Sequence, residues 1–140
     1  MANNYEKLIN AKKAKKDEFY TQYCDIEKEM IHYVDHFFGK TVYCNCDNPE
    51  TSEFVHYFID NFEALGLKSL IATSYSGDEP SLLEPMRKGK LLRLTKAIAY
   101  EDVASYVVEL DGNGNFMSRE CLVLLKEADI VVTNPPLQLV

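Results

Sequence analysis

Apolar side chains recur at steps of three or four residues along the segment that begins at Tyr20. This spacing places them on one side of an α-helix and predicts an amphipathic helix that buries that side. Thr21 suits the capping position of its first turn, and Gly39 suits its end, where a left-handed residue is favoured. The apolar positions are Tyr23, Ile26, Met30, Tyr33 and Phe37.

Two runs of β-branched and apolar residues, 41–46 and 68–73, each predict a buried strand. Between them phenylalanine occurs at every fourth position, which predicts a second helix. Asn48 and Pro49 suit the start of this helix, and Gly66 suits its end. The phenylalanines are Phe54, Phe58 and Phe62.

The middle of the chain interrupts this alternation of helices and strands. Glycines and prolines gather in residues 76–90, which therefore predict a loop. Residues 91–94 and 103–110 are β-prone, and we expect them to pair as a hairpin.

The last third of the chain returns to the helix–strand pattern. A Gly/Asn-rich turn over 111–115 leads to a short helix over 119–127, for which Ser118 is the expected N-cap. A final apolar strand is expected over 129–133, and its unbroken apolar character predicts that helices cover both of its faces.

The order helix, strand, helix, strand, insertion, helix, strand predicts an α/β fold with a mostly parallel sheet flanked by helices. Ligands of such sheets bind beyond the carboxyl ends of the strands. The candidate functional positions are therefore the segments that follow strands, namely 45–49, 73–75 and 134–137.

Composition supports one globular domain, since the chain has 140 residues of which 46% are hydrophobic and 26% charged. No apolar run reaches the ~20 residues that span a bilayer, and the first residues lack the hydrophobic region of a signal peptide. We therefore expect a cytoplasmic protein with no membrane partner.

The net charge of −7 is unevenly distributed. Residues 1–16 hold five lysines and one glutamate, which leaves −11 for the other residues. We expect 1–16 to form a basic flexible tail, either solvated or in contact with phosphate, and 17–140 to form the folded domain. Because Lys and Arg supply most non-specific DNA affinity, so acidic a chain is expected to bind DNA weakly.

The four cysteines, Cys24, Cys44, Cys46 and Cys121, show no spacing typical of a metal site. We interpret them as reduced and mostly structural, and we expect no bound metal.

The segment Asn134-Pro135-Pro136-Leu137 follows the final strand and carries the sharpest functional signal. It resembles the catalytic loop of amino-methylating DNA methyltransferases, which reads Asn-Pro-Pro followed by an aromatic residue. Taken alone, the tripeptide is equally compatible with an ordinary turn, because proline is expected after strands.

Three further segments follow the order of the same enzymes. Phe19, Tyr20 and Thr21 resemble the stretch that folds over S-adenosylmethionine ahead of the first helix. Residues 42–54 occupy the place of the methionine-binding loop, and Asn115 with Phe116 stands where Asp-Phe is common. The layout of residues 17–137 resembles the EcoRI-type adenine-specific DNA methyltransferase family.

This resemblance implies a partial Rossmann-like methyltransferase fold and S-adenosylmethionine-dependent N6-methylation of adenine in DNA. It implies that the target base is flipped into a pocket, where the Asn134 side chain and the Pro135 carbonyl accept hydrogen bonds from the amine. Pro136 and Leu137 complete the implied catalytic loop. The implied cofactor-binding residues are Phe19, Tyr20, Thr21, Asn45, Cys46, Asp47, Asn115 and Phe116.

The chain departs from the family pattern at several positions. Leu137 replaces the aromatic residue that stacks on the base, and Asn115 replaces an aspartate. The loop 44–49 contains no glycine, and no acidic residue follows the second strand in 73–76, which leaves Asp47 or nearby hydroxyl groups to hold the cofactor ribose.

The chain also stops soon after the Asn-Pro-Pro loop, so we expect a truncated fragment with impaired or no catalysis on its own. The alternative is a non-catalytic Rossmann-like binding or interaction module, and a ligand-free structural domain is a third hypothesis. An open apolar edge at the final strand predicts either a homodimer or a partner that supplies the missing carboxyl-terminal half.

Overall fold

The computed structural model describes residues 22–45, 47–77 and 87–133. Within these ranges no helix is long and apolar enough to cross a membrane. The cytoplasmic location stays a prediction. The helical elements are α2 (Tyr23–Met30), η1 (Val34–His36), α3 (Glu53–Asp60), α4 (Phe62–Leu65), η2 (Tyr100–Tyr106) and α5 (Arg119–Glu127).

Five strands form one sheet in the order β4-β3-β2-β1-β5. The pairs β1–β2 and β1–β5 are parallel, whereas β2–β3 and β3–β4 are antiparallel. The strands are β1 (Thr41–Asn45), β2 (Ser69–Thr73), β3 (Lys90–Leu94), β4 (Val107–Glu109) and β5 (Ile130–Thr133). The α/β class and the helix-flanked sheet expected from the sequence are confirmed. The β3–β4 pair is the predicted hairpin, and the hairpin joins the parallel strands through a further antiparallel pair, β2–β3.

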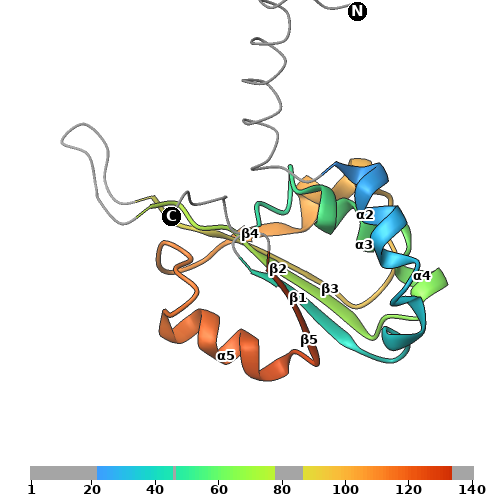
Figure 1. Cartoon of the computed structure of the whole chain (residues 1–140). Helices are drawn as coiled ribbons and strands as arrows, with labels where there is room; N and C mark the ends of the chain where they lie inside the picture. The colour runs from blue at the N-terminus through green and yellow to red at the C-terminus, as the bar shows by residue number, and fades with distance from the viewer. Residues whose placement is uncertain (1–21, 46, 78–86, 134–140) are drawn as a thin grey trace, which may run out of the picture.

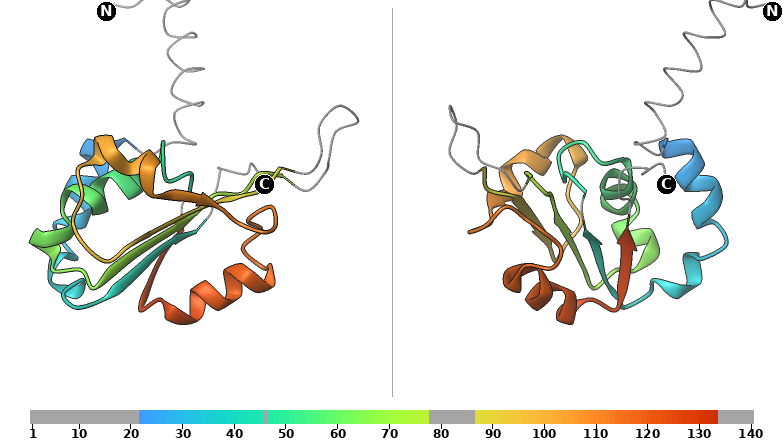
Figure 2. Two further views of the ribbon diagram at one scale, coloured as in Figure 1. Left: turned by 180° about the vertical axis from the view of Figure 1, so that it is seen from behind. Right: turned by 60° about the vertical axis from the view of Figure 1, so that its left-hand side comes forward.

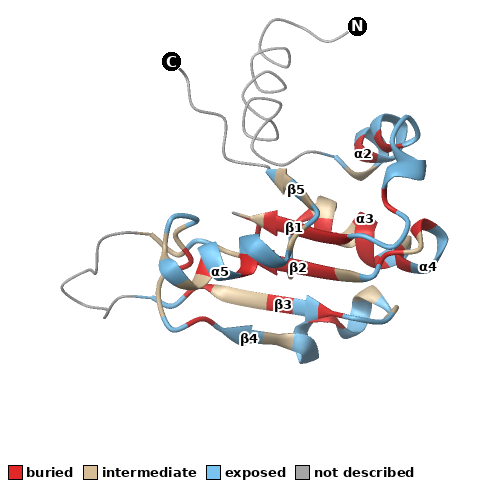
Figure 3. Ribbon diagram, turned by 90° about the horizontal axis from the view of Figure 1, so that it is seen from below, coloured by how far each residue is buried: buried red, intermediate tan, exposed pale blue. Residues whose placement is uncertain are grey.

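Helices cover the two faces of the sheet unequally (Figure 1). On one face α2, α3 and η2 bury the main core, in which Val42, Phe58, Leu70 and Leu92 are fully inaccessible to solvent. On the other face α5 packs over a smaller cluster of Tyr43, Ile71 and Leu124. Burial is therefore greatest in the central strands β1 and β2, as Figure 3 shows.

The first helix is shorter than the apolar spacing predicts. It ends at Met30, and one 3₁₀ turn follows before Gly39, which has a φ of +73°. The prediction of a single long helix is wrong. Tyr33 and Val34 face solvent, so the predicted apolar stripe is buried only at some of its positions. Thr21, the expected cap, lies outside the described residues.

The second helix begins later than predicted. Asn48 does not cap it but closes a turn, in which its Oδ1 accepts a hydrogen bond from the backbone of Glu50 at 3.0 Å. The N-cap is Ser52, whose hydroxyl accepts a hydrogen bond from the Val55 N–H at 3.2 Å. Asparagine side chains favour hydrogen bonds to nearby backbone groups, which made Asn48 a candidate cap. Asn48 makes such a bond, but in the turn that precedes the helix.

Replacing Ser52 with alanine removes this cap and leaves a buried N–H unsatisfied. We expect S52A to lower the free energy of unfolding by about 1 kcal/mol, as measured by urea denaturation. Thr51→Ala is the control, because Thr51 is exposed and outside the helix. Equal losses in the two variants would contradict the assignment of Ser52 as the cap.

The hairpin and the last helix follow the sequence prediction closely. Ser118 caps α5 by accepting a hydrogen bond from the Cys121 N–H at 3.3 Å. The second hairpin strand, however, covers only Val107–Glu109, and the residues before it form η2. Val103 directs its side chain into the main core from this 3₁₀ helix, which satisfies its hydrophobicity without a strand.

Among the described residues, helices do not cover both faces of the final strand β5, contrary to the expectation from its apolar sequence. Val131 and Thr133 are exposed, while Ile130 and Val132 pack against the main core. The cause is position: β5 lies at the edge of the sheet, whereas α5 lies over Tyr43 and Ile71 of the central strands.

Candidate functional site

Four segments meet at the edge of the sheet where the parallel strands end. The carboxyl ends of β1 and β5 lie side by side, with Asn45 paired to Thr133. The end of β2 meets the start of the antiparallel β3, where Ser74 and Lys90 exchange hydrogen bonds. The loop between β4 and α5 begins at the same edge, because Glu109 pairs with Lys90. The topology thus gathers the loops that the sequence marks as candidate sites.

The β1 end contributes two polar side chains, the half-buried Asn45 and the buried Asp47. The Asn45 Oδ1 is buried and has no hydrogen-bond partner among the described residues. Asp47 is only 5% exposed, and its backbone N–H donates to the carbonyl of Thr73 at 2.9 Å. Burial raises the pKa of the neighbouring Cys44 thiol, and the charge of Asp47 raises it further.

An unpartnered buried polar oxygen costs free energy unless something donates to it. Asn45 therefore suits a ligand with hydroxyl, amino or N–H donors, and Asp47 adds an acceptor group on the same loop. The residues present fit the donor groups of a nucleoside-type ligand.

The hydroxyl groups at the β2 end are already engaged within the protein. The Thr73 Oγ1 is buried against the Tyr43 hydroxyl at 2.8 Å, and the Ser74 Oγ accepts from the Lys90 N–H at 2.9 Å. The Ser76 Oγ donates to the carbonyl of Asn113, 3.1 Å away. These hydroxyls therefore serve to hold the protein together, and Asp47 adds a carboxylate on the loop that follows β1.

A close backbone contact fixes the loop between β4 and α5 on the end of β2. A Cβ atom at Gly114 would lie 1.8 Å from the carbonyl oxygen of Ser74, and one at Gly89 would lie 2.6 Å from the same oxygen. Gly114 also has a φ of +82°, which glycine adopts most readily. Both positions therefore require glycine.

Hydrogen bonds reinforce this contact on both sides. The Ser76 N–H donates to the Asn113 carbonyl at 2.8 Å, and the Asn113 amide donates to the carbonyl of Gly77 at 2.9 Å. The Gly89 N–H donates to the carbonyl of Gly112 at 2.8 Å. We call residues 74–77, 89 and 112–114 the glycine junction. Sequence reasoning missed it, although its glycines are the visible signal.

The junction sets the position of the two predicted cofactor residues that follow it. The Asn115 side chain is half-buried, and its Oδ1 accepts from the Met117 N–H at 2.8 Å, which closes a local turn. Phe116 is 52% exposed. Asn115 thus supports the loop backbone, and Phe116 presents an aromatic surface to solvent.

The other predicted site residues lie outside the described residues. They are Phe19, Tyr20, Thr21, Cys46, Asn134, Pro135, Pro136 and Leu137. Their assignments stay predictions. Within the described ranges, no three His, Cys, Asp or Glu side chains gather in a way that could hold a metal ion.

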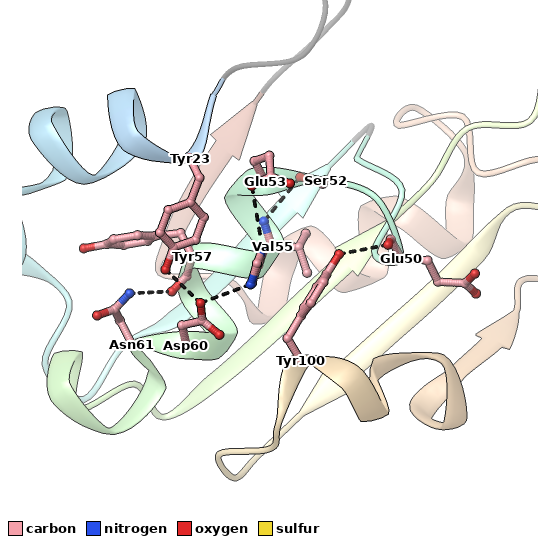
Figure 4. A network of polar contacts seen from close by, with 10 residues as sticks. Tyr23, Glu50, Ser52, Glu53, Val55, Tyr57, Asp60, Asn61 and Tyr100 are labelled. Carbon is pink, nitrogen blue, oxygen red and sulfur yellow. Dashed lines mark hydrogen bonds and ion pairs between the residues drawn. The ribbon is translucent and has the colours of Figure 1, made fainter.

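A second polar cluster is centred on α3 (Figure 4). The His56 ring stacks on Tyr100 with a centroid distance of 3.8 Å, and its Nε2 lies 3.1 Å from Asp60. The Tyr23 hydroxyl donates to the same carboxylate at 2.8 Å. This cluster joins α2, α3 and η2, so we assign it a structural role.

The Tyr23 hydroxyl makes the cluster sensitive to alkaline pH. Burial and the hydrogen bond to Asp60 raise the pKa of Tyr23 to about 12, so the folded protein holds its proton more tightly than the unfolded chain does. Its contribution is complete below the unfolded pKa near 10 and is lost as pH rises through about 12. We expect Tyr23→Phe to flatten the fall in melting temperature across this window, and an unchanged fall would exclude Tyr23 as its cause.

Both a protein family and individual proteins match this chain, and all of them are methyltransferases. The family described as "Adenine-specific methyltransferase EcoRI" matches residues 7–140. The type II methyltransferase M.EcoRI of Escherichia coli is 46% identical over 98% of this chain and 44% of its own length. No solved structure matches.

Two mycoplasma proteins are also similar. The type II methyltransferase M.MpnI of Mycoplasma pneumoniae is 42% identical and M.MgeORF184P of Mycoplasma genitalium 39% identical, each over 92% of this chain and 36% of its own length. The chain thus spans less than half the length of the curated relatives it matches.

Proposed function

This chain belongs to the family of EcoRI-type adenine-specific methyltransferases, and on that basis we propose that it forms the S-adenosylmethionine-binding part of a DNA adenine methyltransferase. The observation that carries the proposal is the buried Oδ1 of Asn45, which has no hydrogen-bond partner among the described residues and lies in the same loop region as the buried Asp47 at the carboxyl end of β1. Ligands of α/β sheets bind at this edge.

Each residue at the carboxyl ends of the strands is assigned to one part of the cofactor. Asp47 accepts hydrogen bonds from the ribose hydroxyls, and Asn45 accepts from a donor group of the cofactor. Phe116 offers its ring to the adenine, held at its place by the glycine junction. Phe19, Tyr20, Thr21, Cys46 and the half-buried Asn115 complete the proposed contacts.

The cofactor supplies an activated methyl group on a sulfonium. The amine of a flipped adenine is a weak nucleophile, because its lone pair is delocalised into the ring. We assign its orientation to the Asn134 side chain and the Pro135 carbonyl, which accept hydrogen bonds from the amine hydrogens. Supporting this, β5 ends at Thr133 directly beside Asn45, so the chain enters this segment from the edge that holds Asp47.

We propose that catalysis by this chain alone is impaired. Leu137 offers no aromatic face for stacking on the base, which is worth ~1–3 kcal/mol where such a face is present. The alternative function is a non-catalytic binding module of the same fold, and it is favoured by Leu137 at the position of the stacking aromatic residue and by Asn115 at the position of the usual aspartate.

Calorimetry with S-adenosylhomocysteine tests the proposal on the whole chain. We expect a dissociation constant of about 0.1–1 mM, since the chain spans less than half of a relative's length. Adenosine measured in parallel shows whether the amino-acid portion contributes. If millimolar ligand produced no heat, the chain would be related to the family by ancestry but would not bind the cofactor, which would contradict the proposal.

DNA binding is expected to be weak and to depend on the basic amino-terminal segment. Removing residues 1–16 takes away five lysines and leaves a net charge of −11, so we expect it to abolish the band shift of a duplex at low salt. A chain with these lysines changed to glutamine is the matched control for length. Salt-resistant, sequence-specific binding by the intact chain would contradict this prediction.

No strand of the described residues pairs with the outer edge of β5. We propose that another polypeptide covers this edge, either as a second copy of this chain in a homodimer or as the carboxyl-terminal half that the family resemblance implies.

A further inference from the structure

The carboxylate of Glu120, in the first turn of α5, binds two consecutive backbone N–H groups of the turn that follows β4. Its Oε1 accepts a hydrogen bond from the Gly112 N–H at 2.7 Å, and its Oε2 accepts one from the Asp111 N–H at 3.1 Å. Hydrogen bonds to a charged acceptor are the stronger kind, and two of them hold the carboxylate in one orientation. We call this contact the Glu120 clamp.

The clamp closes the loop that joins β4 to α5 (Figure 2, left). One end of the loop lies on the glycine junction, because the carbonyl of Gly112 accepts a hydrogen bond from the Gly89 N–H at 2.8 Å. The other end is the start of α5, where Ser118 is the N-cap. Glu120 bonds back to Gly112, so one side chain ties the two ends together. Closing a loop in this way reduces the conformational freedom of the residues between its ends.

Phe116, the ring assigned to the adenine of the cofactor, lies in this loop and depends on it for its position. Its side chain is 52% exposed and belongs to neither hydrophobic cluster of the described residues, so core packing does not fix the ring. The Oδ1 atoms of Asn113 and Asn115 accept from the N–H groups of Asn115 and Met117 at 3.0 and 2.8 Å. These bonds shape the loop itself, whereas the clamp and the glycine junction set where it lies on the domain.

We propose that Glu120 is a positioning residue of the cofactor site, which sets the place of Phe116 through the two N–H groups of the clamp without touching the ligand. The proposal rests on the proposed S-adenosylmethionine site for the role of Phe116. A binding group keeps its productive geometry when the residues that support it are themselves held by hydrogen bonds. Glu120 is suited to this task, because it is half-buried in the first turn of a helix, where a negative charge is favoured.

The other glutamate of α5 offers a matched control. Glu127, the last residue of the helix, binds the Arg93 guanidinium through both carboxylate oxygens at 2.8 and 3.0 Å. This pair ties the same helix to β3 and involves no residue of the loop 111–117. Glu127→Gln and Glu120→Gln therefore make the same chemical change on one helix, and only Glu120→Gln alters a contact of the loop.

Titration of the whole chain with S-adenosylhomocysteine, followed by backbone amide chemical shifts, measures the effect on binding. Glutamine keeps the shape of glutamate but replaces one acceptor oxygen with an NH2 donor, which breaks one of the two bonds of the clamp. We expect Glu120→Gln to raise the dissociation constant about fivefold or more, as the loss of one hydrogen bond does. Glu127→Gln should change it less than about twofold, because an exposed ion pair contributes little.

A double variant distinguishes positioning from a general structural role. If Glu120 acts through Phe116, the clamp has no effect on binding once the ring is removed. The protein with both Phe116→Ala and Glu120→Gln should then bind as weakly as Phe116→Ala alone, within about twofold. An effect of Glu120 that does not pass through Phe116 would instead add to that of Phe116→Ala. Thermal unfolding verifies that each variant is folded at the temperature of the titration.

Amide hydrogen exchange without ligand tests the clamp independently of the cofactor. The N–H groups of Asn115 and Met117 should exchange about threefold faster or more in Glu120→Gln, and at the parent rate in Glu127→Gln. If the parent does not bind S-adenosylhomocysteine, the proposed cofactor site fails, while faster exchange in Glu120→Gln alone would still support Glu120 as the residue that positions the loop. Equal losses of affinity in the two glutamine variants, additive losses in the double variant, or unchanged exchange would overturn the proposal.

Discussion

Gly114→Ala should lower the free energy of unfolding by about 2–5 kcal/mol. The new Cβ would lie 1.8 Å from the Ser74 carbonyl oxygen, and backbone cannot yield as a flexible side chain can. Alanine is also disfavoured at a φ of +82° by roughly 1–2 kcal/mol, and forced overpacking adds typically 1–3 kcal/mol. Urea denaturation of the purified variant measures the loss.

Gly112→Ala is the matched control two residues away. Its Cβ would meet only the end of the Glu120 side chain, at 3.3 Å, so we expect less than about 1 kcal/mol of destabilisation. If the two alanine variants were equally stable, the tight contact between the 112–114 loop and the end of β2 would be refuted.

The second large effect concerns Asp47. We expect Asp47→Asn to weaken binding of S-adenosylhomocysteine at least tenfold, because the change removes the charge of a buried acceptor, and a charge-assisted hydrogen bond is worth about 1.5–3 kcal/mol. Calorimetry on both proteins gives the ratio of dissociation constants.

Asp102→Asn makes the same chemical change at an exposed position on η2 and should leave the affinity unchanged. Melting temperatures of both variants distinguish lost binding from lost folding. An Asp47→Asn protein that is stable and binds with the parent affinity would remove Asp47 from the site.

Local signals in the sequence sufficed where one residue decides the geometry. Ser118 marks the start of α5 because its hydroxyl satisfies an N–H of the first turn, and Gly66 ends α4 in the left-handed conformation, with a φ of +68°. The strands β1 and β2 were predictable because both are buried in continuous apolar runs.

Sequence patterns gave wrong predictions where tertiary contacts decide between two local structures that the sequence allows. Both Asn48 and Ser52 have side chains suited to an N-cap, and in the structure Ser52 caps α3 while Asn48 closes the turn before it. The apolar run of β5 predicts burial on both faces, yet its place at the sheet edge leaves Val131 exposed. Sequence periodicity carries no information about which strand lies at an edge.

The sequence pointed to the loop residues of the candidate site, but not to the glycine junction that holds the neighbouring loop in place. The rule that ligands bind beyond strand ends pointed to Asn45 and Asp47, and the structure buries polar atoms of both there. The glycine junction depends on an approach between Gly114 and Ser74, which are 40 residues apart in the chain. No single-sequence pattern reports a contact of that range.

Mapping of backbone amide chemical shifts during titration with S-adenosylhomocysteine tests the central claim most directly, because it locates binding as well as detecting it. We predict the largest shifts at Asn45, Asp47 and the 113–116 loop, with none at the exposed residues 31–36. Shifts confined to the Tyr23–His56–Tyr100 cluster, or no shifts at millimolar ligand, would contradict a cofactor site at the carboxyl ends of β1 and β2.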